Sequence, residues 1–201
     1  MNFRLIRFAL AIAAAGIFMA NTSAAGAANA AKEPDAAAYC TKKGGVIQTR
    51  VPAYDTNGGN TLILAGQRQF CQFTSKKDGS QISVLLSTLY TKKPSLAALA
   101  YYAQVQMGTC NGNPASCYCT LLGGSDLFGG ATGAGGGWVL KTDYNDVLEA
   151  CIFPDMSSID SWGLAYHSTG IIRGKDLAKV LRYSDPYAER RKAQSVKSMP
   201  F

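Results

Sequence analysis

Two stretches of the chain carry the same short pattern, DAAAYCTKKGG at residues 35–45 and NPASCYCTLLGG at residues 113–124. In both, Tyr-Cys-Thr is followed after two residues by Gly-Gly. A second cysteine follows each pattern at nearly the same distance, in FCQF (70–73) and in ACIF (150–153). Landmarks that recur in the same order at nearly the same spacing indicate a duplicated structural unit.

Each copy is expected to fold as helix, strand, strand, helix. In the first copy an Ala-rich helix ends at Gly44-Gly45, and VIQTRV (46–51) alternates as a strand does. The returning strand is TLILAGQRQFCQF (61–73), and QISVLLSTLY (81–90) suits the closing helix. The predicted fold class is therefore α+β, with two small disulfide-tied helix-strand-strand-helix repeats and an intervening helix.

The chain divides into five segments by composition. Between the copies, KPSLAALAYYAQVQM (93–107) has the apolar spacing of a helix, and GKDLAKVLRY (174–183) predicts a final amphipathic helix. The segments are a signal peptide (1–30), a first repeat unit (31–92), a connecting helix and loop (93–112), a second repeat unit with a C-terminal helix (113–186) and a disordered basic tail (187–201).

The first residues have the features of a secretory signal peptide. Arg4 and Arg7 precede an apolar run from Phe8 to Ala20, and Ala28-Asn29-Ala30 is a suitable cleavage site. The run is shorter than the roughly 20 residues that span a bilayer, so a membrane anchor is not expected. The sequence thus predicts a protein exported to the periplasm or secreted.

Six cysteines follow the predicted leader, and an even number in an exported chain indicates disulfides. Two copies of one unit should be tied in the same way. The pairs expected on this argument are Cys40 with Cys71, Cys119 with Cys151 and, by default, Cys110 with Cys117. The alternative is a metal site built from the four cysteines between residues 110 and 151, which would need reduced thiolates.

The charge distribution is mildly basic. Loss of Arg4 and Arg7 with the leader lowers the formal charge of +7 by two, and much of the remaining excess lies in the tail ERRKAQSVKSMPF (189–201). A basic stripe interleaved with aromatics, typical of nucleic-acid binders, is not evident in the body of the sequence, so no nucleic acid is expected as partner. The tail is expected to be solvated, with contact to an anionic surface as the alternative.

Residues that could perform catalysis are few. His167 is the only histidine, and it stands beside Ser168, whose side chain should point elsewhere. Asp155 and Asp160 flank a predicted turn, where turn formation and helix capping are their expected roles. The glycine-rich segment 123–137 lacks the Gly-Lys-Ser/Thr of a phosphate loop. We therefore expect no enzyme activity, metal or cofactor.

Three features suggest binding. Lys76 and Lys77 lie in a loop just after Cys71, where a basic residue suits the pocket of a trypsin-like protease. Trp138 follows the glycines and is a candidate exposed anchor. From Pro94 to Leu140 only Asp126 carries a charge, so this stretch, with Leu96 and Leu99, is either buried or an interface for another protein.

The second copy resembles a short exported bacterial domain of unknown function that carries the label haemolysin. The likeness rests on NPASCYC and Gly-Gly, on CIFPD (151–155), on Ser157 and on Trp162. Met156 stands where the family pattern has Gly, and the family's later cysteines are absent. The resemblance implies a small exported envelope protein without an established activity, and no functional residues carry over from it.

Together these patterns predict an exported non-enzymatic protein that acts through protein-protein contacts. An accessory or structural subunit of a bacterial envelope assembly is the specific expectation, with another envelope protein as its partner. One alternative is a peptidase inhibitor that presents the basic loop of Lys76 and Lys77. The other is an envelope hydrolase that uses His167.

Overall fold

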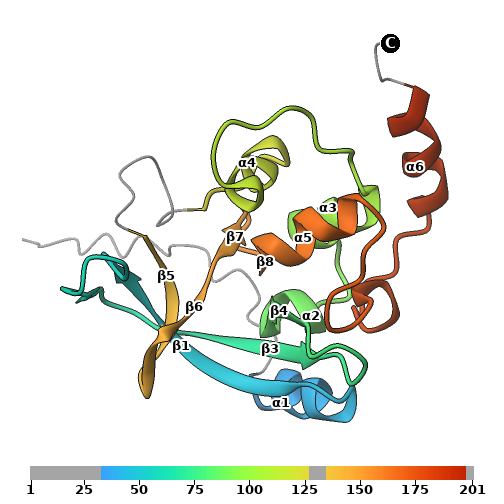
Figure 1. Ribbon diagram of the computed structural model, residues 1–201. Coiled ribbons are helices and arrows are strands. Elements are labelled where there is room, and N and C mark those ends of the chain that lie inside the picture. Colours follow the sequence, from blue (N-terminus) through green and yellow to red (C-terminus); the bar gives the residue numbers. More distant parts are fainter. Residues whose placement is uncertain (1–32, 127–134, 198–201) are drawn as a thin grey trace, which may run out of the picture.

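The computed structural model describes residues 33–126 and 135–197 (Figure 1). Its centre is a curled antiparallel sheet in the order β6-β5-β1-β3-β4-β8-β7, with β2 paired to β1. The strands are β1 (Val46–Tyr54), β2 (Leu62–Ile63), β3 (Arg68–Thr74), β4 (Gln81–Leu85), β5 (Gly136–Leu140), β6 (Asp143–Leu148), β7 (Ala150–Ile152) and β8 (Ser158–Asp160).

Helices pack around this sheet. Five of them, α1 to α5, contribute buried side chains to one main core cluster together with β3 and β4. The helical elements are α1 (Glu33–Lys42), α2 (Leu86–Tyr90), α3 (Leu96–Ala103), α4 (Pro114–Leu121), α5 (Ser161–Ser168), the short 3-10 helix η1 (Leu177–Lys179) and α6 (Ala188–Lys197). No helix of residues 33–126 and 135–197 is both long and apolar enough to cross a membrane.

The sheet curls because its other face folds onto a second, smaller core. Phe70 of β3, Leu85 of β4, Trp138 of β5 and Leu148 of β6 lie in one buried cluster. β6 and β4 are separated by three strands in the sheet order. The ring contact of Phe70 with Trp138 at 5.9 Å bridges β1, and the curled, half-barrel sheet buries this apolar surface on its inner face.

The predicted pair of helix-strand-strand-helix repeats is wrong, because the two halves share one sheet. Val84 of β4 pairs with Ile159 of β8, and Val51 of β1 pairs with Val139 of β5. Of the described residues between α4 and β5, Ser125 forms an isolated bridge with Ile152, in the place that β1 occupies after α1. The unpaired backbone groups at the edge of a strand can bond to any strand of suitable geometry. Strands of the two halves could therefore pair with each other, although the similar sequences suggested two separate units.

The similarity of the two stretches nevertheless has a local structural basis. Gly44 and Gly123 adopt positive φ angles of 84° and 80°, which end α1 and α4 in the left-handed region. The next glycines, Gly45 and Gly124, lie against a disulfide, where an added Cβ would stand 2.3 Å and 2.4 Å from a sulfur. The first glycine therefore permits the turn, and the second permits the close approach to the disulfide.

The three predicted disulfides are present. Cys40 and Cys71 join α1 to β3, Cys119 and Cys151 join α4 to β7, and Cys110 and Cys117 close the loop before α4. The first two bridges are fully buried. Because the four cysteines between residues 110 and 151 are paired as disulfides, the alternative of a metal site made from them is excluded.

Three further expectations are corrected by the structure. QISVLLSTLY is not one helix, because Gln81–Leu85 pair with β3 as β4 and only the remainder forms α2. The helix predicted at 174–183 is reduced to η1. Within the tail expected to be disordered, Ala188–Lys197 form α6, and Arg191 of this helix contacts the buried carboxylate of Asp185. The predicted leader and residues 127–134 of the glycine-rich segment lie outside the described residues.

Candidate binding surface

The basic loop of Lys76 and Lys77 is an exposed, compact turn at the tip of the β3–β4 hairpin. The Ser75 N–H donates to the Ser80 carbonyl oxygen at 2.8 Å, and Asp78 Oδ1 accepts from the Ser80 N–H at 3.1 Å. Hydrogen bonds from Ser75 and then Ser80 lower the pKa of Asp78 to about 2. A protease-inhibiting loop must present extended backbone, so this closed turn does not favour the inhibitor alternative.

Trp138 does not serve as an exposed anchor, which corrects the prediction. Its side chain is 7% exposed and packs against the ring of Phe70, with the guanidinium of Arg68 over its own ring at 5.3 Å. Leu96 is 41% exposed and Leu99 is half-buried on α3. The other face of α3, with Ala97, Ala98, Tyr101 and Tyr102, lies in the main core, so this part of the uncharged stretch is largely buried.

His167 and Ser168 do not form a base and nucleophile pair. The imidazole of His167 stacks on the ring of Tyr101, with centroids 3.8 Å apart and an interplanar angle of 5°. The buried Ser168 hydroxyl donates to the Ala165 carbonyl oxygen at 2.7 Å. This geometry places the serine in the last turn of α5 and does not favour a hydrolase.

Asp155 and Asp160 cap two different helices, as expected for turn residues. The Leu96 N–H donates to Asp155 Oδ2 at 2.8 Å, which places this carboxylate at the start of α3. The Gly163 N–H donates to Asp160 Oδ1 at 3.1 Å at the start of α5. Each carboxylate satisfies free N–H groups of a helix and favours the positive end of its dipole.

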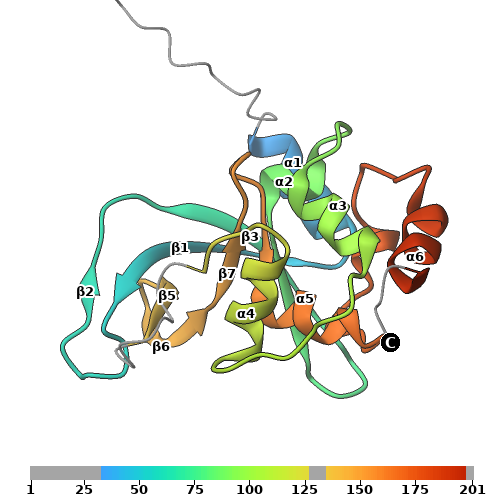
Figure 2. The same ribbon diagram turned by 90° about the horizontal axis from the view of Figure 1, so that it is seen from above.

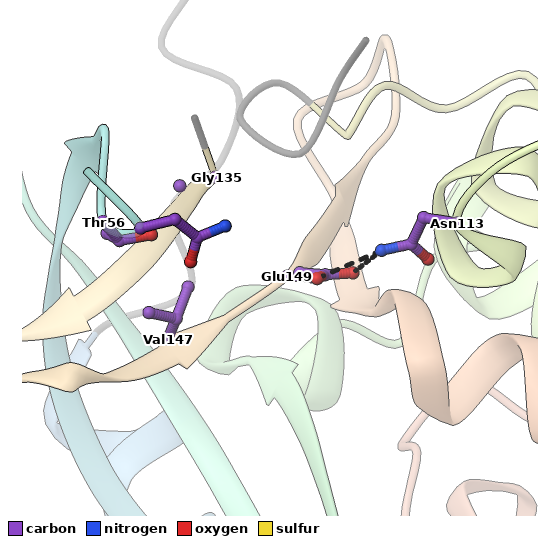
Figure 3. A pocket seen from close by; sticks show the side chains of 7 residues that line it. Thr56, Asn113, Gly135, Val147 and Glu149 are labelled. Carbon is purple, nitrogen blue, oxygen red and sulfur yellow. Dashed lines mark hydrogen bonds between the residues drawn. The ribbon is translucent and has the colours of Figure 1, made fainter. Parts of the chain in front are cut away.

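A polar pocket lies between the β5–β6 hairpin and α4 (Figure 3). Its cavity volume of about 190 Å³ is below the roughly 300 Å³ at which ligand sites begin. Asn113 Nδ2 donates to both carboxylate oxygens of Glu149, while Asn113 Oδ1 accepts from the Ala115 N–H at the start of α4. Burial, and then the charge of Asp126, raise the pKa of Glu149. We interpret this contact as a structural tie between α4 and the sheet.

The tertiary structure assembles a surface that the sequence analysis missed. We call it the basic-tyrosine surface and define it by Tyr39, Lys43, Tyr90 and Arg182. The Arg182 guanidinium carbon lies 3.9 Å from the centroid of Tyr90 and 5.7 Å from that of Tyr39. Lys43 Nζ lies 5.4 Å from the Tyr39 centroid, and the two tyrosines meet edge to face at 5.7 Å. Two rings thus form a platform beneath two cations.

Backbone contacts hold this platform together. Figure 1 and Figure 2 show α1 and α2 side by side, and the chain between α5 and α6 passes next to them. The Arg182 N–H donates to the Leu89 carbonyl oxygen of α2 at 3.0 Å. The Tyr39 hydroxyl donates to the Val180 carbonyl oxygen at 2.8 Å. These bonds fix residues 180–182 across the ends of both helices.

The charge of this surface is not neutralised by neighbouring carboxylates. Among the residues that the structure describes, the ion pairs are Arg50–Asp146, Lys179–Asp176 and Arg191–Asp185, so neither Lys43 nor Arg182 has an acidic partner there. Lys42 at the end of α1 and Lys92 and Lys93 after α2 are exposed. In the sequence, a Lys-Lys pair follows closely after Tyr39 and another after Tyr90, and this pattern could have indicated part of the surface. Nothing in the sequence places Arg182 beside these residues.

No family model matches the chain, and no curated protein or solved structure is similar enough to count as a match. The resemblance to the haemolysin-labelled domain therefore stays a prediction. Its residues have structural roles here: Asn113 caps α4, Phe153 is buried in the core, and Asp155 and Ser157 cap α3. The residues that carry the resemblance therefore serve packing and helix capping, and none of them belongs to the basic-tyrosine surface.

Proposed function

We propose that this protein is an exported, non-enzymatic binding protein that contacts an acidic partner protein of the bacterial envelope through the basic-tyrosine surface. The observation that carries the proposal is the position of Arg182 and Lys43 on two tyrosine rings without a carboxylate partner among the described residues. Uncompensated cations on ordered aromatic side chains suit a complementary negative surface, because such charges steer and orient association.

Export to the periplasm or the medium is part of this proposal. Three disulfides suit an oxidising compartment, and the residues before α1 have the pattern of a signal peptide. The role of accessory or structural subunit is supported by this contact surface and by the structural roles of Asp155, Asp160 and Ser168.

In-cell photo-crosslinking tests the proposed function. A photoreactive residue at Lys92, beside Tyr90, should capture a defined partner protein, whereas one at Lys141 in the β5–β6 turn should not. The double variant Lys43→Gln, Arg182→Gln should abolish the Lys92 cross-link. Lys76→Gln, Lys77→Gln removes the same charge from the hairpin tip and serves as the matched control. An unchanged cross-link in the Lys43 and Arg182 variant, with normal export, would contradict the proposal.

A further inference from the structure

We infer that the basic-tyrosine surface binds an extended, carboxylate-rich peptide segment and that Arg182 makes the principal contact with it. The inference rests on the proposed function and names the chemistry of the partner. Three observations lead to it: how the guanidinium of Arg182 is held, which of its donors remain available, and how the neighbouring cations are distributed.

The contact of Arg182 with Tyr90 leaves its hydrogen-bond donors available. The guanidinium carbon lies over the Tyr90 ring at 3.9 Å from its centroid, and an attraction to a ring face does not require the five N–H donors of the guanidinium. No side-chain hydrogen bond of Arg182 is found among the described residues. A carboxylate is the partner that this planar fork binds with two parallel hydrogen bonds.

Arg182 is also ordered before any partner arrives. Its backbone N–H is bonded to Leu89 of α2, and Val180 two residues earlier is bonded to the Tyr39 hydroxyl of α1. The two rings restrict the side chain from below. A side chain that is already held loses less conformational entropy on binding, so more of the contact energy appears as affinity.

The neighbouring cations come from separate segments of the chain. Lys43 lies over Tyr39, the Lys175 ammonium donates to the Lys43 carbonyl oxygen at the end of α1, and Lys92 and Lys93 follow Tyr90 in the chain. Alternate side chains of an extended peptide lie about 6.6 Å apart on one side. Lys43 and Arg182 lie 5.4 Å and 5.7 Å from the centroid of the Tyr39 ring, so successive carboxylates of an extended peptide suit these cations better than a single phosphate does.

A membrane surface suits the same residues less well. A protein that inserts into the interface of a bilayer places aromatic or apolar side chains beside its cations. Here the rings of Tyr39 and Tyr90 are half-buried and already lie under Lys43 and Arg182. These rings are therefore engaged within the protein and are poor candidates for insertion.

The test uses the full mature chain and a fluorescent hexaglutamate peptide, with binding measured by anisotropy at two salt concentrations. Wild type should bind, and binding should weaken as salt increases. Arg182→Gln should weaken binding roughly 10-fold or more, and Arg182→Lys, which keeps the charge but loses the fork, about 5-fold. The matched control Lys76→Gln, Lys77→Gln should stay within about 2-fold of wild type.

Two competitors distinguish the sources of negative charge. Inorganic phosphate at the same charge concentration, and vesicles of phosphatidylcholine and phosphatidylglycerol in equal parts, should not displace the peptide. Displacement by either, or equal binding by Arg182→Lys and wild type, would overturn the inference. Thermal unfolding of each variant verifies its fold.

The outcomes also separate this inference from the proposed function. Arg182-dependent peptide binding without an in-cell partner would contradict the proposed function alone. A cross-linked partner lost in the Lys43 and Arg182 variant, together with no peptide binding, would overturn the inference alone.

Discussion

The carboxylate of Asp155 accepts a hydrogen bond at 2.8 Å from the backbone N–H of Leu96, a residue that precedes it by 59 positions. Ser157 completes the contact, since its hydroxyl accepts from the Ala97 N–H at 2.9 Å and donates to Asp155 Oδ1. The turn between β7 and β8 thereby caps α3, which supplies Tyr101 and Tyr102 to the main core. The loop that contains Asp155 and Ser157 therefore caps a helix that lies far away in the sequence.

Replacement of Asp155 by Ala should destabilise the protein by about 1–2 kcal/mol, because α3 loses a cap and a favourable charge at its N-terminus. Asp155→Asn keeps an acceptor and should cost less. Chemical denaturation followed by circular dichroism measures both. Equal unfolding free energies for Asp155→Ala and wild type would show that the cap contributes nothing measurable.

Replacement of Met156 by Gly should stabilise the protein. Met156 has a φ of 64° and a side chain that is 55% exposed, so little packing is lost. Relief of the left-handed conformation gains about 1–2 kcal/mol, of which the entropy of glycine removes about half. The resemblance to the haemolysin-labelled domain has Gly at this position. Met156→Ala keeps the backbone strain and is the control, and a Gly variant no more stable than the Ala variant would contradict the expectation.

The pH dependence of stability should change when Asp160 is replaced. Burial raises the pKa of Asp160 to about 6, against hydrogen bonds from backbone N–H groups that lower it. Because the folded protein holds this proton more tightly than the unfolded chain does, the contribution of Asp160 to stability falls as pH rises from about 4 to about 6 and is constant above that window.

Asp160→Asn retains a capping oxygen but cannot ionise. Between pH 4 and pH 6 its free energy of unfolding should therefore rise relative to wild type by up to roughly 3 kcal/mol. Denaturation curves at several pH values test this. A constant difference between the two proteins over this range would show that Asp160 has an ordinary pKa.

The disulfide between Cys110 and Cys117 should be the first to be reduced. Both of its cysteines are half-buried, whereas the other four are fully buried. Its short loop should contribute about 2.5 kcal/mol, against about 3.7 kcal/mol for each long bridge. Graded reduction, alkylation and peptide mass mapping give the order. Earlier reduction of Cys40 and Cys71 would contradict this prediction.

Sequence reasoning worked best where contacts are close along the chain or are covalent. The helix ends at Gly44 and Gly123 and the helix at Leu96–Ala103 follow from local residue preferences. The disulfide pairs followed from the repeated pattern. The same reasoning failed at Gln81–Leu85, where apolar residues that suit a helix pair instead with β3 on one side and meet β8 on the other.

By itself, the amino-acid sequence determined the cysteine pairing, the glycine turns beside the disulfides and the capping role of Asp160, because each depends on a specific side chain or its absence. Only the tertiary structure decided that both halves share one curled sheet and that Arg182 rests on Tyr39 and Tyr90. Every strand edge carries the same backbone N–H and C=O groups, so these groups do not specify which strand pairs with which. The pairing is selected by the burial of apolar side chains over the whole chain. The proposed binding surface is a consequence of that selection.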